Sequence, residues 1–445
     1  MREMLFALLV GSCVMAPGCN KKDVAMAIAP AADEMAPRSA PEAVSAGSAS
    51  VGGDMGGAMA KGDTAAAAAP TMRAPVSSVQ AGEWDDNANY RDYVRWLEEA
   101  DRSAQRLDIT DREFVVVKDR DGKAVPNCQV TITSPTGKAS LITMASGRAI
   151  VFPNDLGLHG DTLDAIAACG RSQVAGKIST KTADGVTELS LDTARTLATR
   201  RTVDLAFVLD TTGSMGEEIE AVKGTIRAVA DKLSNDQTSV RIGLVEYKDR
   251  SDGNDLTHTY PFSSDLHEFS RSVAALRADG GGDTPEDMHA GLTAALDNLQ
   301  WSQDAVARLV VVIADAPPHL DYQDEQDYGA AARRAAAHGI KLFTVSASGM
   351  DDTGQIVMRQ MAQYTGASNM FVMRGGAGPD SVGGGDPKSS CGGSHENYAS
   401  GKLDQLILGK VTRELASLDA DPMSIPGRGQ DENAKPCNQR LVMAN

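Results

Sequence analysis

The C-terminal part of the chain alternates long apolar runs with amphipathic stretches. Four apolar runs have the length and composition of buried strands: Val203 to Leu209, Val240 to Tyr247, Leu309 to Ile313 and Ile340 to Val345. Four stretches between them carry apolar residues at helical spacing: Glu217 to Leu233, Leu266 to Leu276, Pro285 to Leu299 and Tyr328 to His338. Strands that alternate with helices predict an α/β fold with a doubly wound, mostly parallel sheet and helices on both faces.

The region before this sheet divides into a helical part and a β-rich part. From residue 83 to 112, apolar positions recur every three or four residues, which predicts a docking helix, and we interpret the preceding Asp85-Asp86 pair as a cap. From 113 to 200 the period changes to two, as in Cys128 to Thr133, which predicts a small β-sandwich. This part is similar to the carboxypeptidase regulatory-like and immunoglobulin-like modules of exported bacterial proteins, which implies a spacer or a contact surface.

The first residues have the pattern of a secretory signal. Arg2 precedes an apolar run that ends at Ala16-Pro17-Gly18-Cys19, which is too short to span a bilayer but typical of an export signal. The end of this run resembles the lipobox of bacterial lipoproteins, in which the cysteine becomes the lipidated first residue. We interpret residues 1–19 as a signal peptide with a lipobox and Cys19 as the lipidation site. Cys13, or a plain signal peptide without lipidation, is the alternative.

The next segment, residues 20–82, is rich in Ala, Pro, Gly and Ser and contains no aromatic residue between Phe6 and Trp84. Such a segment cannot bury enough apolar area to offset the entropy of ordering its backbone, so we predict a disordered linker. Asn20, directly after the cysteine, resembles an outer-membrane sorting signal of Gram-negative cells. The chain is therefore expected in the cell envelope, anchored by lipid to the membrane and located at the outer membrane or cell surface.

The net charge of the chain limits the classes of partner that we expect. The chain has 445 residues, with 43 basic and 60 acidic side chains and a formal net charge of -17. Proteins that bind nucleic acid use a net basic face to neutralise phosphates, so we expect no nucleic-acid partner.

Polar side chains with the chemistry of a cation site follow the predicted strands. Asp210, Thr212 and Ser214 lie in the loop after the first strand, Thr284 lies in a glycine-rich loop, and Asp315 follows the third strand. Because ligands of doubly wound sheets bind beyond the carboxyl ends of the strands, these loops are expected at one edge. A set of oxygen ligands without Cys or His suits Mg²⁺, and Mn²⁺ or Ca²⁺ would suit the same oxygens, whereas zinc is a poor match.

This pattern resembles the metal-ion-dependent adhesion site (MIDAS) of von Willebrand factor type A domains, and the likeness extends over about residues 201–420. The resemblance implies that the two hydroxyls of the first loop bind Mg²⁺ directly and that the carboxylates bind mostly through water. It also implies that an Asp or Glu carboxylate of a partner protein completes the site, so the chain would be a non-enzymatic protein-binding module for adhesion or scaffolding.

Two other functions stay open at this point. One is an envelope scaffold whose metal is purely structural and whose partners contact the β-rich part. The other is a metal-dependent hydrolase, for which His319 is the candidate general base. The sequence has neither the glycine-rich lysine motif of phosphate loops nor a zinc-protease His-Glu-x-x-His motif.

Four cysteines follow the predicted signal peptide, and an even number in an exported chain suggests disulfide bonds. Three pairings are conceivable. Domain boundaries favour Cys128 with Cys169 inside the β-rich part and Cys391 with Cys437, which would tie the tail at 421–445 to a glycine-rich insertion at 375–400. The last helix of the α/β domain is expected near Leu403 to Leu415.

Overall fold

The structure is a computed structural model, and it describes residues 79–423 apart from 89, 101, 182–183, 234–237, 254–255, 283, 323–325, 348 and 373–398. All described residues belong to one compact unit, residues 72–445. Four cysteines of the sequence analysis, Cys13, Cys19, Cys391 and Cys437, lie outside the described residues, as do the predicted signal peptide and nearly all of the linker.

An eight-stranded sheet forms the centre of the α/β part. Its strands follow the order β11, β10, β9, β12, β13, β14, β1, β15. In chain order they are β1 (Gln80–Trp84), β9 (Arg201–Asp210), β10 (Thr238–Tyr247), β11 (Thr257–Ser263), β12 (Ala307–Ala314), β13 (Ile340–Ser346), β14 (Asn369–Val372) and β15 (Ala399–Lys402). The five strands from β10 to β14 in this order are parallel, whereas β11 and β1 pair antiparallel with their neighbours. The mostly parallel α/β fold predicted from the sequence is confirmed.

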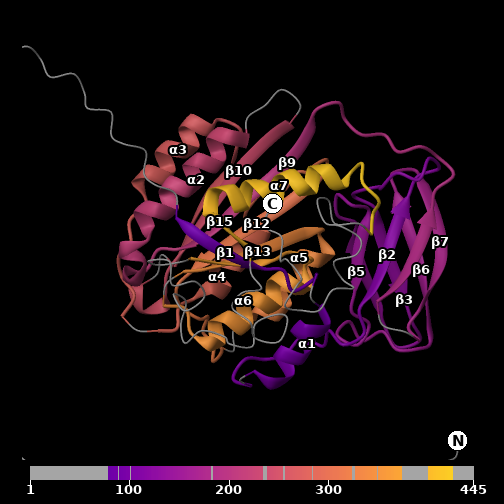
Figure 1. Cartoon of the computed structure of the whole chain (residues 1–445), viewed down its shortest axis with the longest axis horizontal. Coiled ribbons are helices and arrows are strands. Elements are labelled where there is room, and N and C mark those ends of the chain that lie inside the picture. Colours follow the sequence, from indigo (N-terminus) through magenta and orange to yellow (C-terminus); the bar gives the residue numbers. More distant parts are fainter. Residues whose placement is uncertain are drawn as a thin grey trace, which may run out of the picture. The chain divides into compact units, whose positions relative to one another are not determined.

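Helices cover both faces of this sheet (Figure 1). One face carries α2 (Ile219–Leu233), α3 (Leu266–Ala275) and α7 (Leu403–Ser417), and the other carries α4 (Met288–Asp297), α5 (Tyr328–Ala337) and α6 (Asp352–Tyr364). Strand β9 serves both cores, because Phe207 and Leu209 face the first helix layer while Ala206 and Val208 face the second. No helix within the described residues has the length and apolar character that crossing a bilayer requires.

The segment before the β module differs from the prediction. A helix was expected from residue 83, but residues Gln80–Trp84 form β1, and the helix α1 covers only Tyr90–Glu99. Strand β1 lies between β14 and β15, with Gly82 opposite both Phe371 and Ser400. Its hydrogen-bond partners thus lie about three hundred residues away, and local sequence pattern cannot reveal them.

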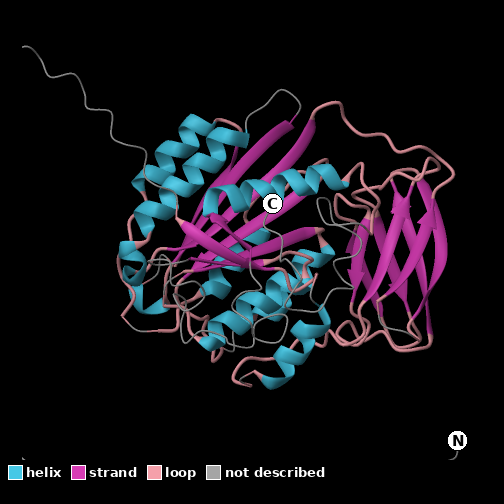
Figure 2. Ribbon diagram, viewed as in Figure 1, coloured by secondary structure: helices cyan, strands magenta, loops and turns pink. Residues whose placement is uncertain are grey.

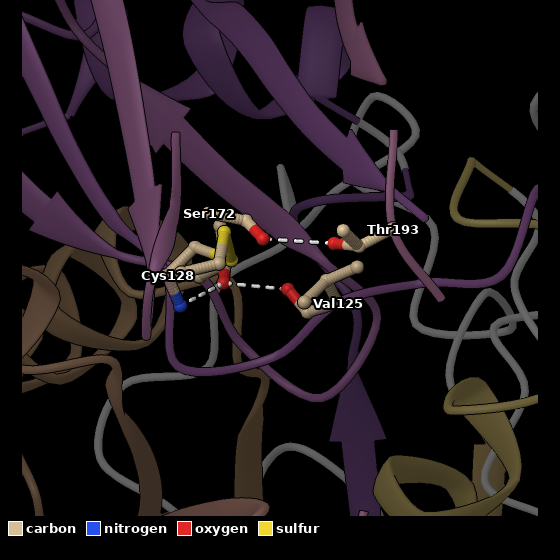
Figure 3. Close-up of a disulfide and its surroundings, with 6 residues drawn as sticks. Val125, Cys128, Ser172 and Thr193 are labelled. Carbon is tan, nitrogen blue, oxygen red and sulfur yellow. Dashed lines mark hydrogen bonds between the residues drawn. A yellow bond between two sulfur atoms is a disulfide. The ribbon is translucent and has the colours of Figure 1, made fainter. Parts of the chain in front are cut away.

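The β module consists of two small sheets (Figure 2). Their strands are β2 (Glu113–Lys118), β5 (Arg148–Val151) and β8 (Gly185–Ser190) in one sheet, and β3 (Gln129–Thr133), β4 (Lys138–Ile142), β6 (Thr162–Cys169) and β7 (Ser172–Ser179) in the other. The predicted disulfide between Cys128 and Cys169 is formed (Figure 3). It extends the antiparallel pairing of β3 with β6 by one position, beyond the pair Gln129 and Ala168.

Specific contacts join this module to the α/β domain. The carboxylate of Asp155 accepts two hydrogen bonds of 2.7 Å from Arg333 and one of 2.9 Å from the Tyr364 hydroxyl. Arg308, at the start of β12, donates to the side-chain oxygen of Asn127 at 2.8 Å. The two parts also share one hydrophobic core cluster, so the module is packed against the α/β domain.

Candidate metal centre at the carboxyl edge of the sheet

The loop after β9 folds back onto the last residue of that strand. The backbone N–H and the hydroxyl of Thr212 both donate to one carboxylate oxygen of Asp210, at 2.9 and 2.7 Å. Directly after Thr212, the 3₁₀ helix η1 (Gly213–Glu217) begins, and the Ser214 hydroxyl lies 3.1 Å from the Thr212 hydroxyl. The sequence Asp-x-Thr-x-Ser therefore places three oxygen-bearing side chains on one tight loop.

Asp315 comes to this loop from another strand. Strands β9 and β12 are parallel neighbours, so the residue after β12 lies beside the end of β9. The Ser214 hydroxyl donates to Asp315 at 3.0 Å. Four of the five predicted ligands are thereby brought together: Thr212 donates to Asp210, Ser214 donates to Asp315, and the two hydroxyl oxygens lie 3.1 Å apart.

Thr284, the fifth predicted ligand, is not part of this group of four. Its side chain is exposed, and its hydroxyl forms no hydrogen bond with any residue that the structure describes. It precedes Pro285 through a cis peptide bond in the loop before α4. Its role as a ligand stays a prediction.

Glu286 is a further acidic residue at this edge, and the sequence analysis did not assign it to the site. Its side chain is 2% exposed. It lies close to Thr212, because a Cβ atom added at Gly281 would be 2.9 Å from both the Glu286 Oε1 and the Thr212 Cβ. Two backbone hydrogen bonds with the loop after β12 fix Glu286, one to Pro317 and one from His319. Its sequence signal was an acidic residue two positions beyond Thr284.

Burial raises the pKa values of the Asp210, Glu286 and Asp315 carboxyl groups. Desolvation raises the pKa of Asp210 to about 7, against hydrogen bonds from Thr212 that lower it. Desolvation, followed by the charge of Asp210, raises the pKa of Glu286 to about 8. Burial also raises the pKa of Asp315, whose carboxylate the hydrogen bond from Ser214 partly stabilises. A nearby positive charge would lower all three values.

The oxygen atoms at this edge fit a hard cation. Asp210 Oδ2 and Glu286 Oε2 are buried and have no hydrogen-bond partner in the described part of the chain. Each hydroxyl that donates its proton to a carboxylate keeps its lone pairs for an ion. The two hydroxyl oxygens lie 3.1 Å apart. Adjacent ligands of an octahedral Mg²⁺ with bonds of about 2.1 Å would lie about 3.0 Å apart.

Neighbouring residues do not form a conventional metal cluster. Among the described residues, no group of three or more His, Cys, Asp and Glu side chains is arranged to hold a metal ion. A centre here would therefore depend on the hydroxyl groups of Thr212 and Ser214 as much as on the carboxylates.

His319, the candidate general base, belongs to a separate cluster. Its ring stacks on Tyr322 with 3.9 Å between centroids. One ring nitrogen lies 2.8 Å from Asp321 and the other 3.2 Å from Asp249. The His319 side chain is thus held by its own loop and by the loop after β10, and no described contact joins it to the hydroxyls of Thr212 and Ser214.

Fold and site together define a doubly wound α/β domain with a hydroxyl and carboxylate centre at the carboxyl ends of adjacent parallel strands. Residues 204–376 match the von Willebrand factor type A domain, so the chain contains a domain of this family. These domains generally mediate contacts between proteins.

Curated relatives match about a quarter of this chain. The alpha-protein kinase vwkA of Dictyostelium discoideum is 36% identical over 119 residues, which are 26% of this chain and 19% of that protein. The human von Willebrand factor A domain-containing protein 7 is 35% identical over 128 residues, 28% of this chain and 13% of that protein. The chain thus spans less than a fifth of these relatives.

Solved structures give a weaker likeness. An aerotolerance-related membrane protein from Bacteroides fragilis aligns with a TM-score of 0.30 and 17% identity, over 41% of this chain and 96% of that one. BatB from Bacteroides thetaiotaomicron aligns with a TM-score of 0.29 and 16% identity, over 39% of this chain and 89% of that one.

Proposed function

We propose that this protein binds a partner protein through a Mg²⁺ ion held at the carboxyl edge of the sheet. The arrangement of Asp210, Thr212, Ser214 and Asp315 carries this proposal, because each carboxylate accepts the proton of one hydroxyl and leaves the lone pairs of two oxygens that lie 3.1 Å apart for an ion. Thr212 and Ser214 would bind the ion, and Asp210, Asp315 and Glu286 would orient them and hold water. Mn²⁺ or Ca²⁺ could replace Mg²⁺ in the same oxygen set.

The partner would supply an Asp or Glu carboxylate. Two hydroxyls and water neutralise none of the ion's charge themselves, so an incoming carboxylate gains a charge-assisted contact in a partly buried place. Thr284, exposed on the loop beside Glu286, would stabilise this carboxylate-bound form. In this proposal the ion joins two proteins and performs no chemistry.

The same proposal locates the protein in the cell envelope. The apolar start of the chain, Gly18-Cys19 and the polar segment behind it support export and lipidation at Cys19. A linker of about sixty residues would let the binding domain stand clear of the membrane. Replacing Cys19 with serine should release the protein from the membrane fraction.

Calorimetric titration tests the metal part of this proposal. Parent protein should bind Mg²⁺, and binding of an isolated partner should disappear when EDTA removes the ion. Thr284→Ala should reduce partner affinity about ten- to a hundredfold while changing Mg²⁺ affinity less, because a charge-assisted contact contributes about 1.5 to 3 kcal/mol. Partner binding that persists unchanged in EDTA would instead favour a scaffold with a structural metal, or no metal.

A further inference from the structure

A wide cleft lies at the edge of the sheet opposite to the candidate metal centre. It has a volume of about 1190 Å³, and one wall is formed where β9, β12 and β13 begin, at Arg201, Arg308 and Ile340. Val125, Ser172 and Thr193 of the β module and the segment after it contribute to the other wall. Parallel strands begin at one edge and end at the other, so the cleft and the metal centre are separate sites.

Positive charge is concentrated in this cleft. Five arginines line it: Arg171, Arg195, Arg200, Arg201 and Arg308. Asp304 is the one carboxylate side chain among its described lining residues. The whole chain has a net charge of -17. A basic cleft on an acidic protein selects an anionic ligand, because the rest of the surface repels that ligand.

Most of these guanidinium groups bond to neutral oxygen atoms. Arg308 donates to carbonyls of Ser302 and Gln303 at 2.8 to 3.0 Å, and Arg200 donates to a carbonyl at 3.4 Å. Within the described residues, only Arg195 of the five forms an ion pair, with Asp419 at 2.7 Å. Arg308 is buried with its donors occupied, so the charges most available to a carboxylate are those of exposed Arg171 and Arg200, and a planar guanidinium suits the two oxygens of a carboxylate.

Apolar side chains and free backbone groups accompany the arginines. Half-buried Ile142, Leu197, Leu296 and Trp301 also line the cleft. The lining segment 191–198 forms no helix or strand, and the N–H groups of Thr196 and Leu197 donate to no described residue. An extended polypeptide can bind the arginines, the apolar side chains and the backbone N–H groups at once. A fully hydrated polyanion would have no apolar groups to pack against the apolar side chains.

We propose that this cleft binds an extended acidic segment of a partner protein, in which carboxylate and apolar side chains alternate. Its carboxylates would pair with exposed Arg171 and Arg200, and its apolar side chains would pack on Leu197 and Trp301. Binding here requires no metal ion, and it is independent of the function proposed for the opposite edge.

Fluorescence anisotropy can test this proposal on the intact protein with a labelled peptide of repeated Glu-Leu-Ser units. We expect saturable binding that weakens as salt rises and that EDTA leaves unchanged. The double variant with Arg171→Ala and Arg200→Ala should bind the peptide at least tenfold more weakly. Arg120→Ala is the matched control, because Arg120 is an exposed arginine of the β module outside the cleft, paired with Asp121. Arg120→Ala should leave the affinity for the peptide unchanged.

Other outcomes would overturn the proposal. A peptide with Gln in place of Glu must bind at least tenfold more weakly, and equal binding would exclude recognition of carboxylates. Inorganic polyphosphate that binds more tightly than the peptide would exclude the peptide as the ligand class. Loss of peptide binding in EDTA, or in Asp210→Ala, would show that the peptide binds at the candidate metal centre and not in the cleft. Thermal unfolding of each variant checks that it is folded.

Discussion

Ser214 donates a 3.0 Å hydrogen bond to Asp315, although 101 residues separate them in the chain. The order of the sheet creates this contact, because β12 lies directly beside β9 and both strands end at the same edge. The bond uses the single proton of the hydroxyl and so points its lone pairs away from Asp315. The Ser214 hydroxyl would therefore already have the orientation that is needed to bind an ion.

The first prediction concerns the carboxylate that orients Thr212. Asp210→Ala removes the acceptor of two Thr212 hydrogen bonds and one anionic anchor, so Mg²⁺ binding should be abolished in calorimetric titration. Asp121→Ala, a change at an exposed carboxylate of the β module, should bind Mg²⁺ like the parent. If Asp210→Ala also binds like the parent, the ion is elsewhere.

A second prediction follows from the raised pKa values of Asp210, about 7, and Glu286, about 8. The folded state favours their protonated forms, whereas the unfolded chain ionises near pH 4. In EDTA, the free energy of unfolding should therefore fall as pH rises from about 4 to about 8, by at most about 1.4 kcal/mol per pH unit for each carboxyl. Urea denaturation at several pH values measures this slope.

Mg²⁺ should reverse part of this trend, because the ion favours the ionised carboxylates. Its stabilising effect should be larger at pH 8 than at pH 5. A double variant, Asp210→Asn with Glu286→Gln, is the control and should lose most of the pH dependence. A slope that is the same in this variant would contradict the assignment to these two groups.

A third prediction concerns a buried ion pair that sequence analysis misjudged. Asp86 was interpreted as part of a cap, but its carboxylate accepts two hydrogen bonds from Arg359 of α6, at 2.8 and 2.7 Å. Both side chains are at most 2% exposed. Asp86→Ala should lower the free energy of unfolding by about 3 to 5 kcal/mol, since it leaves a buried charge without its partner.

Asp85→Ala is the matched control for this change. Asp85 accepts a hydrogen bond from the Ala88 backbone at 2.9 Å, and loss of such a local bond should cost about 1 kcal/mol. Urea denaturation compares the two variants. Equal effects would show that the pair with Arg359 contributes no special stability.

A fourth prediction concerns the disulfide of the β module. The double variant with Cys128→Ala and Cys169→Ala removes a cross-link between residues with a sequence separation of 41. Its free energy of unfolding should be lower by about 2 to 4 kcal/mol. Parent protein in reducing agent should show the same loss. Peptide mapping under non-reducing conditions checks the pairing, and any cross-link from Cys128 to another cysteine would contradict it.

Sequence pattern was informative where the determining contacts are local. The strand before Asp210 is apolar on both faces, and Thr212 and Ser214 lie within four residues of it, so both strand and loop could be predicted. Asp315 followed from the rule that functional loops come after parallel strands. These four residues are the ones that the structure brings together, as two hydrogen-bonded pairs whose hydroxyl oxygens lie 3.1 Å apart.

The remainder depends on contacts between distant segments. Gln80–Trp84 has no strand pattern and becomes β1 only by pairing with β14 and β15. The partner of Asp86 is 273 residues away. Glu286 could not be assigned because its burial beside Thr212 depends on how the glycine-rich loop folds back over the β9 loop.

That glycine-rich loop supports the last prediction. Gly281 has φ +70°, where a side chain is strained, and a Cβ there would lie 2.9 Å from Thr212 and from Glu286. Gly281→Ala should therefore displace both side chains and weaken Mg²⁺ binding at least tenfold in calorimetric titration. Its neighbour Gly282 is the control, since a Cβ there meets only the Ser251 hydroxyl oxygen, at 3.9 Å. Gly282→Ala should bind Mg²⁺ normally, and equal loss in both variants would mean that loop flexibility, not the contact with Thr212 and Glu286, controls the ion.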